Sequence, residues 1–147
     1  MAKRSKQTRK KKTEKGFGIG AILVLAVFII SIISSLLLLW QRIPLIIGLQ
    51  ATIGVWVSFV LLLIYFVFLL MSVYLMTLKR RSAIKMSLNT IVAGVVFIIW
   101  YDIIGIVIFY GGLDVTRLLE FFINAGISLV IFFYIKNSKR VKEIFVG

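Results

Sequence analysis

The sequence predicts an all-α integral membrane protein, folded as a bundle of four transmembrane helices. One observation is composition: 61% of the 147 residues are hydrophobic and 16% are charged, against about 45–50% and 25% in soluble domains. The other is that most basic residues gather in three segments separated by long apolar runs. Together these patterns indicate a chain that uses lipid as its solvent, with both termini on the cytoplasmic side.

The first predicted helix covers residues 17–40, a run without any charged residue. A helix needs about 20 residues to cross a hydrocarbon core of about 30 Å, so this run is long enough. Trp40 ends it at the depth where interfacial aromatic residues gather. Residues 41–50, which include Pro44, are expected to form a short connection and an interfacial or re-entrant lead-in to the next helix.

Three further helices are predicted, over residues 52–78, 86–110 and 115–135. The apolar run from 43 to 78 would make a helix of roughly 54 Å, too long for one upright span and too short for two. We therefore expect a single helix from residue 52, tilted or projecting beyond the membrane. A turn at Gly111-Gly112 separates the last two helices.

The distribution of basic residues predicts the orientation in the cell membrane. A disordered N-terminal tail (1–15), a central loop (79–85) and a C-terminal tail (136–147) hold 8, 4 and 4 of the 18 basic residues. The transmembrane domain proper spans residues 16–135. Basic segments stay on the cytoplasmic side, and four spans place all three of them there.

These basic segments predict contacts with phosphate groups, since the net charge is +13. Anionic lipid headgroups are the favoured source, at about 1 kcal/mol per basic residue near the membrane surface. Nucleic acid or the ribosome is the alternative, less favoured because residues 1–15 contain no aromatic side chain for base stacking. The candidate contacts are Lys3, Arg4, Lys6, Arg9, Lys10, Lys11, Lys12, Lys79, Arg80, Arg81, Lys139, Arg140 and Lys142.

Asp102 is an acidic residue inside the predicted third helix, where a carboxylate costs about 2.5–3.5 kcal/mol to insert. Such residues usually face the bundle interior and have a partner. The fourth helix offers a polar stripe with helical spacing, made of Arg117, Glu120 and Asn124. Counted from the turn between the helices, Asp102 and Asn124 lie about 12 and 13 Å deep, so the two are expected to be level.

Two hypotheses describe this polar cluster. In the first, Asp102 is a helix–helix clamp that bonds Asn124 or pairs with Arg117. In the second, Asp102, Glu120 and Asn124 form a proton or cation site. We favour the clamp, because a basic residue lies nearby and a single acid in the membrane centre is little for a proton relay.

Small residues follow one face of the second predicted helix. Gly54, Ser58 and Ser72 share this face with Tyr65, at spacings that permit close helix packing. Packing within the bundle is the favoured interpretation, and a homo-oligomer face is the alternative.

The C-terminal segment carries a resemblance. Tyr134 is followed after three residues by Ser138-Lys139-Arg140-Val141-Lys142, and after two more by Phe145. This ending is similar to that of a prokaryotic family of small four-span membrane proteins, the domain of unknown function 2569 family. Its members usually carry a Trp-x-Pro-Tyr sequence before the motif, and this chain lacks both that Trp and that Pro. The resemblance implies the four-span fold and no activity.

The residue types present exclude several function classes. The chain has no Cys and no His, so thiolate nucleophiles, imidazole bases and His-ligated haem are excluded, and no cofactor is predicted. No Gly-x-Ser-x-Gly signature is present, and we do not expect an enzyme. The sequence favours a scaffold or accessory subunit, with a membrane-protein partner or a second copy as its contact. A small transporter, channel or proton-coupled subunit that uses Asp102 is the alternative.

Overall fold

The computed structural model describes residues 18–48, 52–104 and 115–145, and all the regular structure in these ranges is helical. The elements are α1 (Ile19–Ile47), α2 (Ile53–Thr77), α3 (Ser82–Ile98), the π-helical segment η1 (Ile99–Ile104), α5 (Val115–Asn137) and α6 (Lys139–Ile144). Four helices are long and apolar enough to cross a membrane: α1, α2, α3 continued by η1, and α5. The predicted all-α class and the four apolar spans are confirmed.

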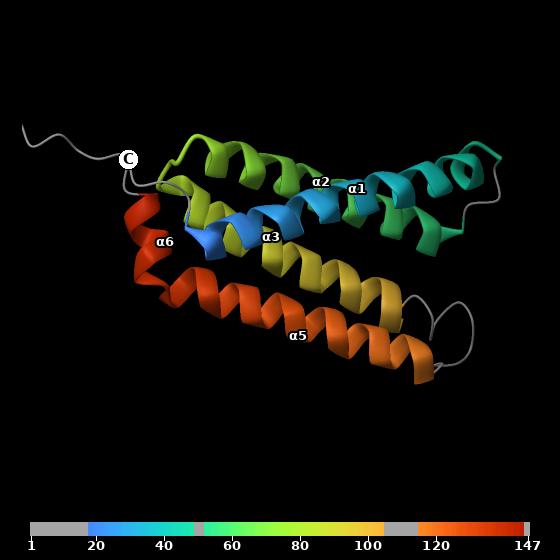
Figure 1. The fold of residues 1–147 in the computed structure, drawn as a ribbon. Coiled ribbons are helices and arrows are strands. Elements are labelled where there is room, and N and C mark those ends of the chain that lie inside the picture. The colour runs from blue at the N-terminus through green and yellow to red at the C-terminus, as the bar shows by residue number, and fades with distance from the viewer. Residues whose placement is uncertain (1–17, 49–51, 105–114, 146–147) are drawn as a thin grey trace, which may run out of the picture.

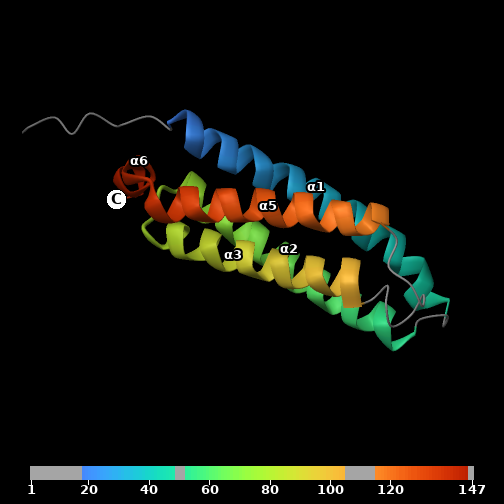
Figure 2. The ribbon, with the colours of Figure 1, turned by 90° about the horizontal axis from the view of Figure 1, so that it is seen from below.

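The four spans lie side by side in a bundle, and successive spans run in opposite directions (Figures 1 and 2). Helix α2 packs against α1 and α3, and α5 packs against α3 and η1. The start of α1, the α2–α3 connection, the end of α5 and α6 lie at one end of the bundle, which we call the basic end. The end of α1, the start of α2, η1 and the start of α5 lie at the opposite end.

Helix α1 is longer than predicted, because it continues through Pro44 to Ile47. The expected connection at residues 41–47 is therefore wrong, and residues 49–51 lie outside the described ranges. A proline removes one backbone hydrogen bond, but in an apolar solvent leaving the helix would orphan several more backbone groups. The Gly48 N–H still donates to the Pro44 carbonyl at 2.9 Å. At 29 residues, α1 is about 43 Å long and must tilt or project beyond a core of about 30 Å.

The connection between α2 and α3 is tighter than the predicted loop of residues 79–85. Lys79 adopts a left-handed backbone with φ 50°, and its N–H donates to the Met76 carbonyl at 3.0 Å. The Arg80 N–H reaches back to the Leu75 carbonyl at 3.2 Å, which completes a Schellman motif. Helix α3 then begins at Ser82 rather than at 86. The central basic cluster is thus held on a turn of a few residues.

The predicted C-terminal tail contains a helix that the sequence analysis did not anticipate. Helix α6 begins after Ser138, whose side-chain oxygen accepts a hydrogen bond from the Val141 N–H at 3.3 Å. Val141, Ile144 and Phe145 are buried against the bundle. Helix α6 therefore crosses the basic end as part of the folded domain (Figure 1).

Two hydrophobic clusters hold the bundle together. The larger lies towards the basic end and joins Ala21, Met76, Ala83 and Ile135 from the four spans to the buried side of α6. The smaller lies towards the opposite end around Leu39, Leu62 and Phe97, and includes no residue of α5. Helix α5 is therefore fixed most firmly near its C-terminal end.

Candidate functional site

The polar residues between α2 and α3 form a closed hydrogen-bond network. Ser72 and Thr90 are buried, with their hydroxyl oxygens 2.6 Å apart. The Thr90 oxygen also lies 3.0 Å from the Phe68 carbonyl and 2.9 Å from the Met86 carbonyl. Because a hydroxyl has one proton, Thr90 donates to a carbonyl and Ser72 donates to Thr90. This network joins the two helices and offers no free group for chemistry.

A second interhelical contact lies nearer the opposite end. The Trp100 indole N–H of η1 donates to the Ser58 hydroxyl at 3.1 Å, and Ser58 donates to the Gly54 carbonyl at 2.8 Å. Gly54, Ser58 and Ser72 are all buried. The favoured interpretation of these small residues, packing within the bundle, is confirmed.

Aromatic rings form a row from the middle of the bundle to the opposite end. Tyr65 stacks on Phe97 with centroids 6.1 Å apart, and Phe97 stacks on Tyr101 at 5.7 Å. The Arg42 guanidinium lies over the Tyr101 ring at 5.3 Å and ties α1 to η1. A Cβ added at Gly94 would lie 2.8 Å from the Tyr65 ring, so this glycine makes room for the row.

Asp102 lies within η1 and is 6% exposed. A π-helical segment is rare and often marks a functional site, because it redirects the side chains of one turn. No side-chain nitrogen or oxygen that is buried within the described residues lacks a hydrogen-bond partner. The structure thus places a buried carboxylate in a π-helical segment of an apolar span.

Two of the polar residues predicted to lie near Asp102 are exposed on α5. Asn124 and Glu120 are both exposed on α5, and the Asn124 backbone carbonyl accepts from Ser128 at 2.8 Å. The described contacts do not include a hydrogen bond between Asp102 and Asn124. The residue count predicts depth along the bundle, but not which side of α5 faces η1, although the two elements are in contact. The Arg117 side chain lies outside what the structure describes.

The basic end brings together charged groups from separate parts of the chain. Helix α6 buries its apolar side and leaves Lys139, Arg140 and Lys142 exposed. Arg80 and Arg81 on the α2–α3 connection are also exposed. The predicted contacts at Lys3, Arg4, Lys6, Arg9, Lys10, Lys11 and Lys12 lie outside the described residues.

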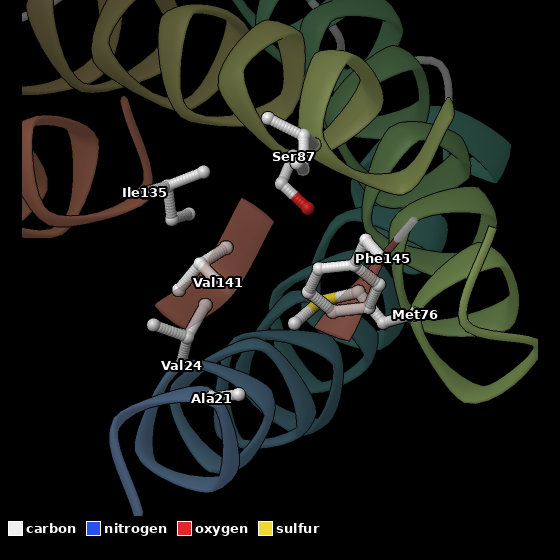
Figure 3. A pocket seen from close by; sticks show the side chains of 8 residues that line it. Ala21, Val24, Met76, Ser87, Ile135, Val141 and Phe145 are labelled. Atoms are coloured by element: carbon white, nitrogen blue, oxygen red, sulfur yellow. The ribbon is translucent and has the colours of Figure 1, made fainter. Parts of the chain in front are cut away.

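Helix α6 packs closely against the ends of the spans. Figure 3 shows Val141 and Phe145 pointing towards Ala21, Met76 and Ser87. These residues line a cavity of about 10 Å³, roughly the space of one water molecule. The aliphatic part of the Arg140 side chain packs beside Gly18, where an added Cβ would lie 3.6 Å from the Arg140 Cδ. The charged guanidinium therefore extends from an apolar contact towards the outside. The cavity is too small for a ligand.

The docking of α6 is the feature that the sequence analysis missed. Its signal was present: Val141, Ile144 and Phe145 follow an i, i+3, i+4 pattern behind a capping Ser138. Interpreting residues 136–147 by charge alone concealed this pattern. The two aromatic residues that begin and end this motif both pack against the bundle. Tyr134 lies over Gly20, where an added Cβ would collide with its hydroxyl, and Phe145 is buried.

Comparison with protein families, with characterised proteins and with solved structures finds no significant match. Among the described residues, no group of three or more His, Cys, Asp or Glu could hold a metal ion. The fold and the candidate sites define an all-helical bundle with four apolar spans. Its function must be argued from the basic end and from Asp102.

Proposed function

We propose that this protein is a non-enzymatic scaffold or accessory subunit of the cell membrane, which binds anionic lipid headgroups at its basic end. The observation that carries the proposal is the docked α6. Its buried apolar side fixes Lys139, Arg140 and Lys142 on the outside of the bundle, at the end that also holds Arg80 and Arg81.

The orientation follows from the same charges. Basic residues near the ends of transmembrane helices stay on the cytoplasmic side, so the basic end faces the cytoplasm. Both termini then lie in the cytoplasm, where the N-terminal basic tail adds to the charge. Anionic lipids are concentrated in that leaflet and attract juxtamembrane basic residues.

A lipid partner fits this surface better than nucleic acid does. The exposed basic residues lie at one end of four apolar spans, which is where lipid headgroups meet a transmembrane bundle. Because the apolar side of α6 is buried against the bundle, its charged side is the one that faces outward from that end. The resemblance of its motif to a four-span family agrees with this arrangement and supplies no activity.

The test is lipid binding by the full chain in nanodiscs that contain a fixed fraction of phosphatidylglycerol. Changing Lys139, Arg140 and Lys142 to Gln removes three charges, each worth about 1 kcal/mol near the membrane surface. The affinity for anionic lipid should therefore fall on the order of 100-fold at low salt. Arg42→Gln, at the opposite end, is the control and should retain lipid. High salt should weaken binding by the wild-type chain. Equal retention by the triple variant and wild type would contradict the proposal.

The orientation has its own test, because the chain contains no Cys. A cysteine at Ser82 should react with a membrane-impermeant maleimide only after the membrane is opened. A cysteine at Gly112 should react in intact cells. Reaction at Ser82 in intact cells would contradict the proposed orientation.

A second candidate function rests on Asp102, a buried carboxylate in a π-helical segment. On this hypothesis the protein is a small transporter, channel or proton-coupled subunit, and Asp102 exchanges a proton or cation. Flux through wild-type proteoliposomes that disappears in Asp102→Asn, with unchanged melting temperature, would favour it. No flux in wild type would leave Asp102 as a structural clamp.

A further inference from the structure

Helix α5 is the least buried of the four spans. In the most apolar 18-residue stretch of α5, 6% of the residues are buried, against 33% in the corresponding stretch of the span formed by α3 and η1. Most of its exposed side chains are large and apolar, such as Phe122, Ile123 and Val130, and lipid chains can cover them. Lipid chains cannot satisfy exposed polar residues on the same helix, because they form no hydrogen bonds.

Asn124 is such a residue. It lies nine residues after the start of α5 and thirteen before its end, roughly 13 and 20 Å by helical rise, so it sits within the hydrocarbon core. Its side chain is exposed. No hydrogen bond of its amide group is described within the chain, and only its backbone carbonyl is used, by Ser128. An exposed amide at this depth needs a partner from outside the chain.

The neighbours of Asn124 define the face of the helix. Residues 120, 124 and 127 follow spacings of four and three, the pattern of a short coiled-coil seam, which ends where Ile131 packs against the core of the bundle. Glu120 and Ile127 are exposed on either side of Asn124. A polar Asn inside such a seam fixes register between two parallel helices.

We infer that this face of α5 binds the α5 helix of a second copy of the chain, with Asn124 paired to Asn124. An amide group is both donor and acceptor, so two identical Asn side chains satisfy each other across a two-fold axis. An axis along the membrane normal sets both residues at the same depth. Glu120 lies one turn before Asn124 on the same seam and is also exposed.

The occupancy of the other faces supports this choice. The small residues of α2, which the sequence offered as a candidate homo-oligomer face, are buried inside the bundle. Asn124 is the exposed amide that the described part of α5 presents in the middle of its span. This inference is independent of lipid binding at the basic end.

Single-cysteine crosslinking tests the inference in native membranes, because the chain has no Cys of its own. Ile127→Cys places a thiol on the Asn124 face, and Leu129→Cys places one on nearly the opposite side of α5. The two positions are a matched pair, at 50% and 55% exposure. Mild oxidation should give a disulfide-linked dimer with Ile127→Cys, at a yield at least about fivefold above that of Leu129→Cys.

A second substitution tests the amide itself. Asn124→Leu in the Ile127→Cys chain should lower the dimer yield at least about fivefold, and Asn124→Gln should largely restore it. Single-molecule photobleaching in vesicles should find two copies for wild type and one for Asn124→Leu. Equal crosslinking at residues 127 and 129, an unchanged yield in Asn124→Leu, or crosslinking of Ile127→Cys only to a different protein would each overturn the inference.

Discussion

Polar side chains are buried at the α2–α3 interface and exposed on helix α5. Between α2 and α3, hydroxyl groups such as Ser72 and Thr90 are buried and hydrogen-bonded to the facing helix. On α5, Glu120 and Asn124 point outward, and apolar contacts near the basic end hold the helix in place. The difference separates hydroxyl groups that join helices within the bundle from the Asn124 amide, which is exposed to partners outside it.

The largest expected effect comes from filling the space at Gly94. Gly94→Leu should destabilise the bundle by about 3 kcal/mol, because the Tyr65 ring occupies the position of the new side chain. Gly126→Leu on α5 is the matched control, since an added Cβ there meets no atom within 4 Å. It should be neutral or slightly stabilising. Unfolding in mild detergent measures both, and equal losses would mean that the two regions are packed alike.

A smaller effect is expected from loosening α6. Phe145→Ala should cost about 2 kcal/mol of α6 docking, the scale of burying an aromatic side chain, while the four spans stay folded. Trypsin cleavage at Lys139, Arg140 and Lys142 should then accelerate about 30-fold, in proportion to the undocked population. Phe133→Ala, at a residue 54% exposed on α5, is the control. An unchanged cleavage rate would show that Phe145 does not hold α6 in place.

The smallest effect is expected from the hydroxyl network between α2 and α3. Thr90→Val should cost about 1 kcal/mol, the scale of interhelical hydrogen bonds in membranes. Ser72→Ala should cost a similar amount, and the double variant should cost less than the sum, because the two residues share one contact. Thr77→Val is the control, since the exposed Thr77 hydroxyl bonds only within its own helix. Additive losses at residues 72 and 90 would contradict the pairing.

The sequence predicted the parts of this fold that hydrophobicity decides. Four apolar runs gave four spans, and the limits of α2 and α5 were predicted to within about two residues. The end of α1 was missed because Pro44 was taken as a helix stop, although an apolar solvent makes leaving the helix costly. The π-helical geometry around Asp102 was not predicted, because the apolar pattern of residues 99–104 is the same in an α-helix.

The candidate sites were predicted less evenly. Burial of Asp102 followed from its position in an apolar helix, and exposure of Lys139, Arg140 and Lys142 followed from their charge. The proposed contact of Asp102 with Asn124 required knowing which side of α5 faces η1, which helical periodicity does not determine. Thr90 was not singled out, because a lone hydroxyl in a helix becomes informative only when its partner on another helix is known.

The hydrogen bond from Trp100 to Ser58 also has a spectroscopic consequence. The chain has three tryptophans, of which Trp40 and Trp56 are 75% and 48% exposed, while Trp100 is only partly exposed and bonded inside the bundle. Lipids with brominated chains quench indole fluorescence by contact, so they should quench the fluorescence of Trp40 and Trp56 first. The emission that survives would come chiefly from Trp100. It would report on the packing of η1 next to Asp102 without any added label.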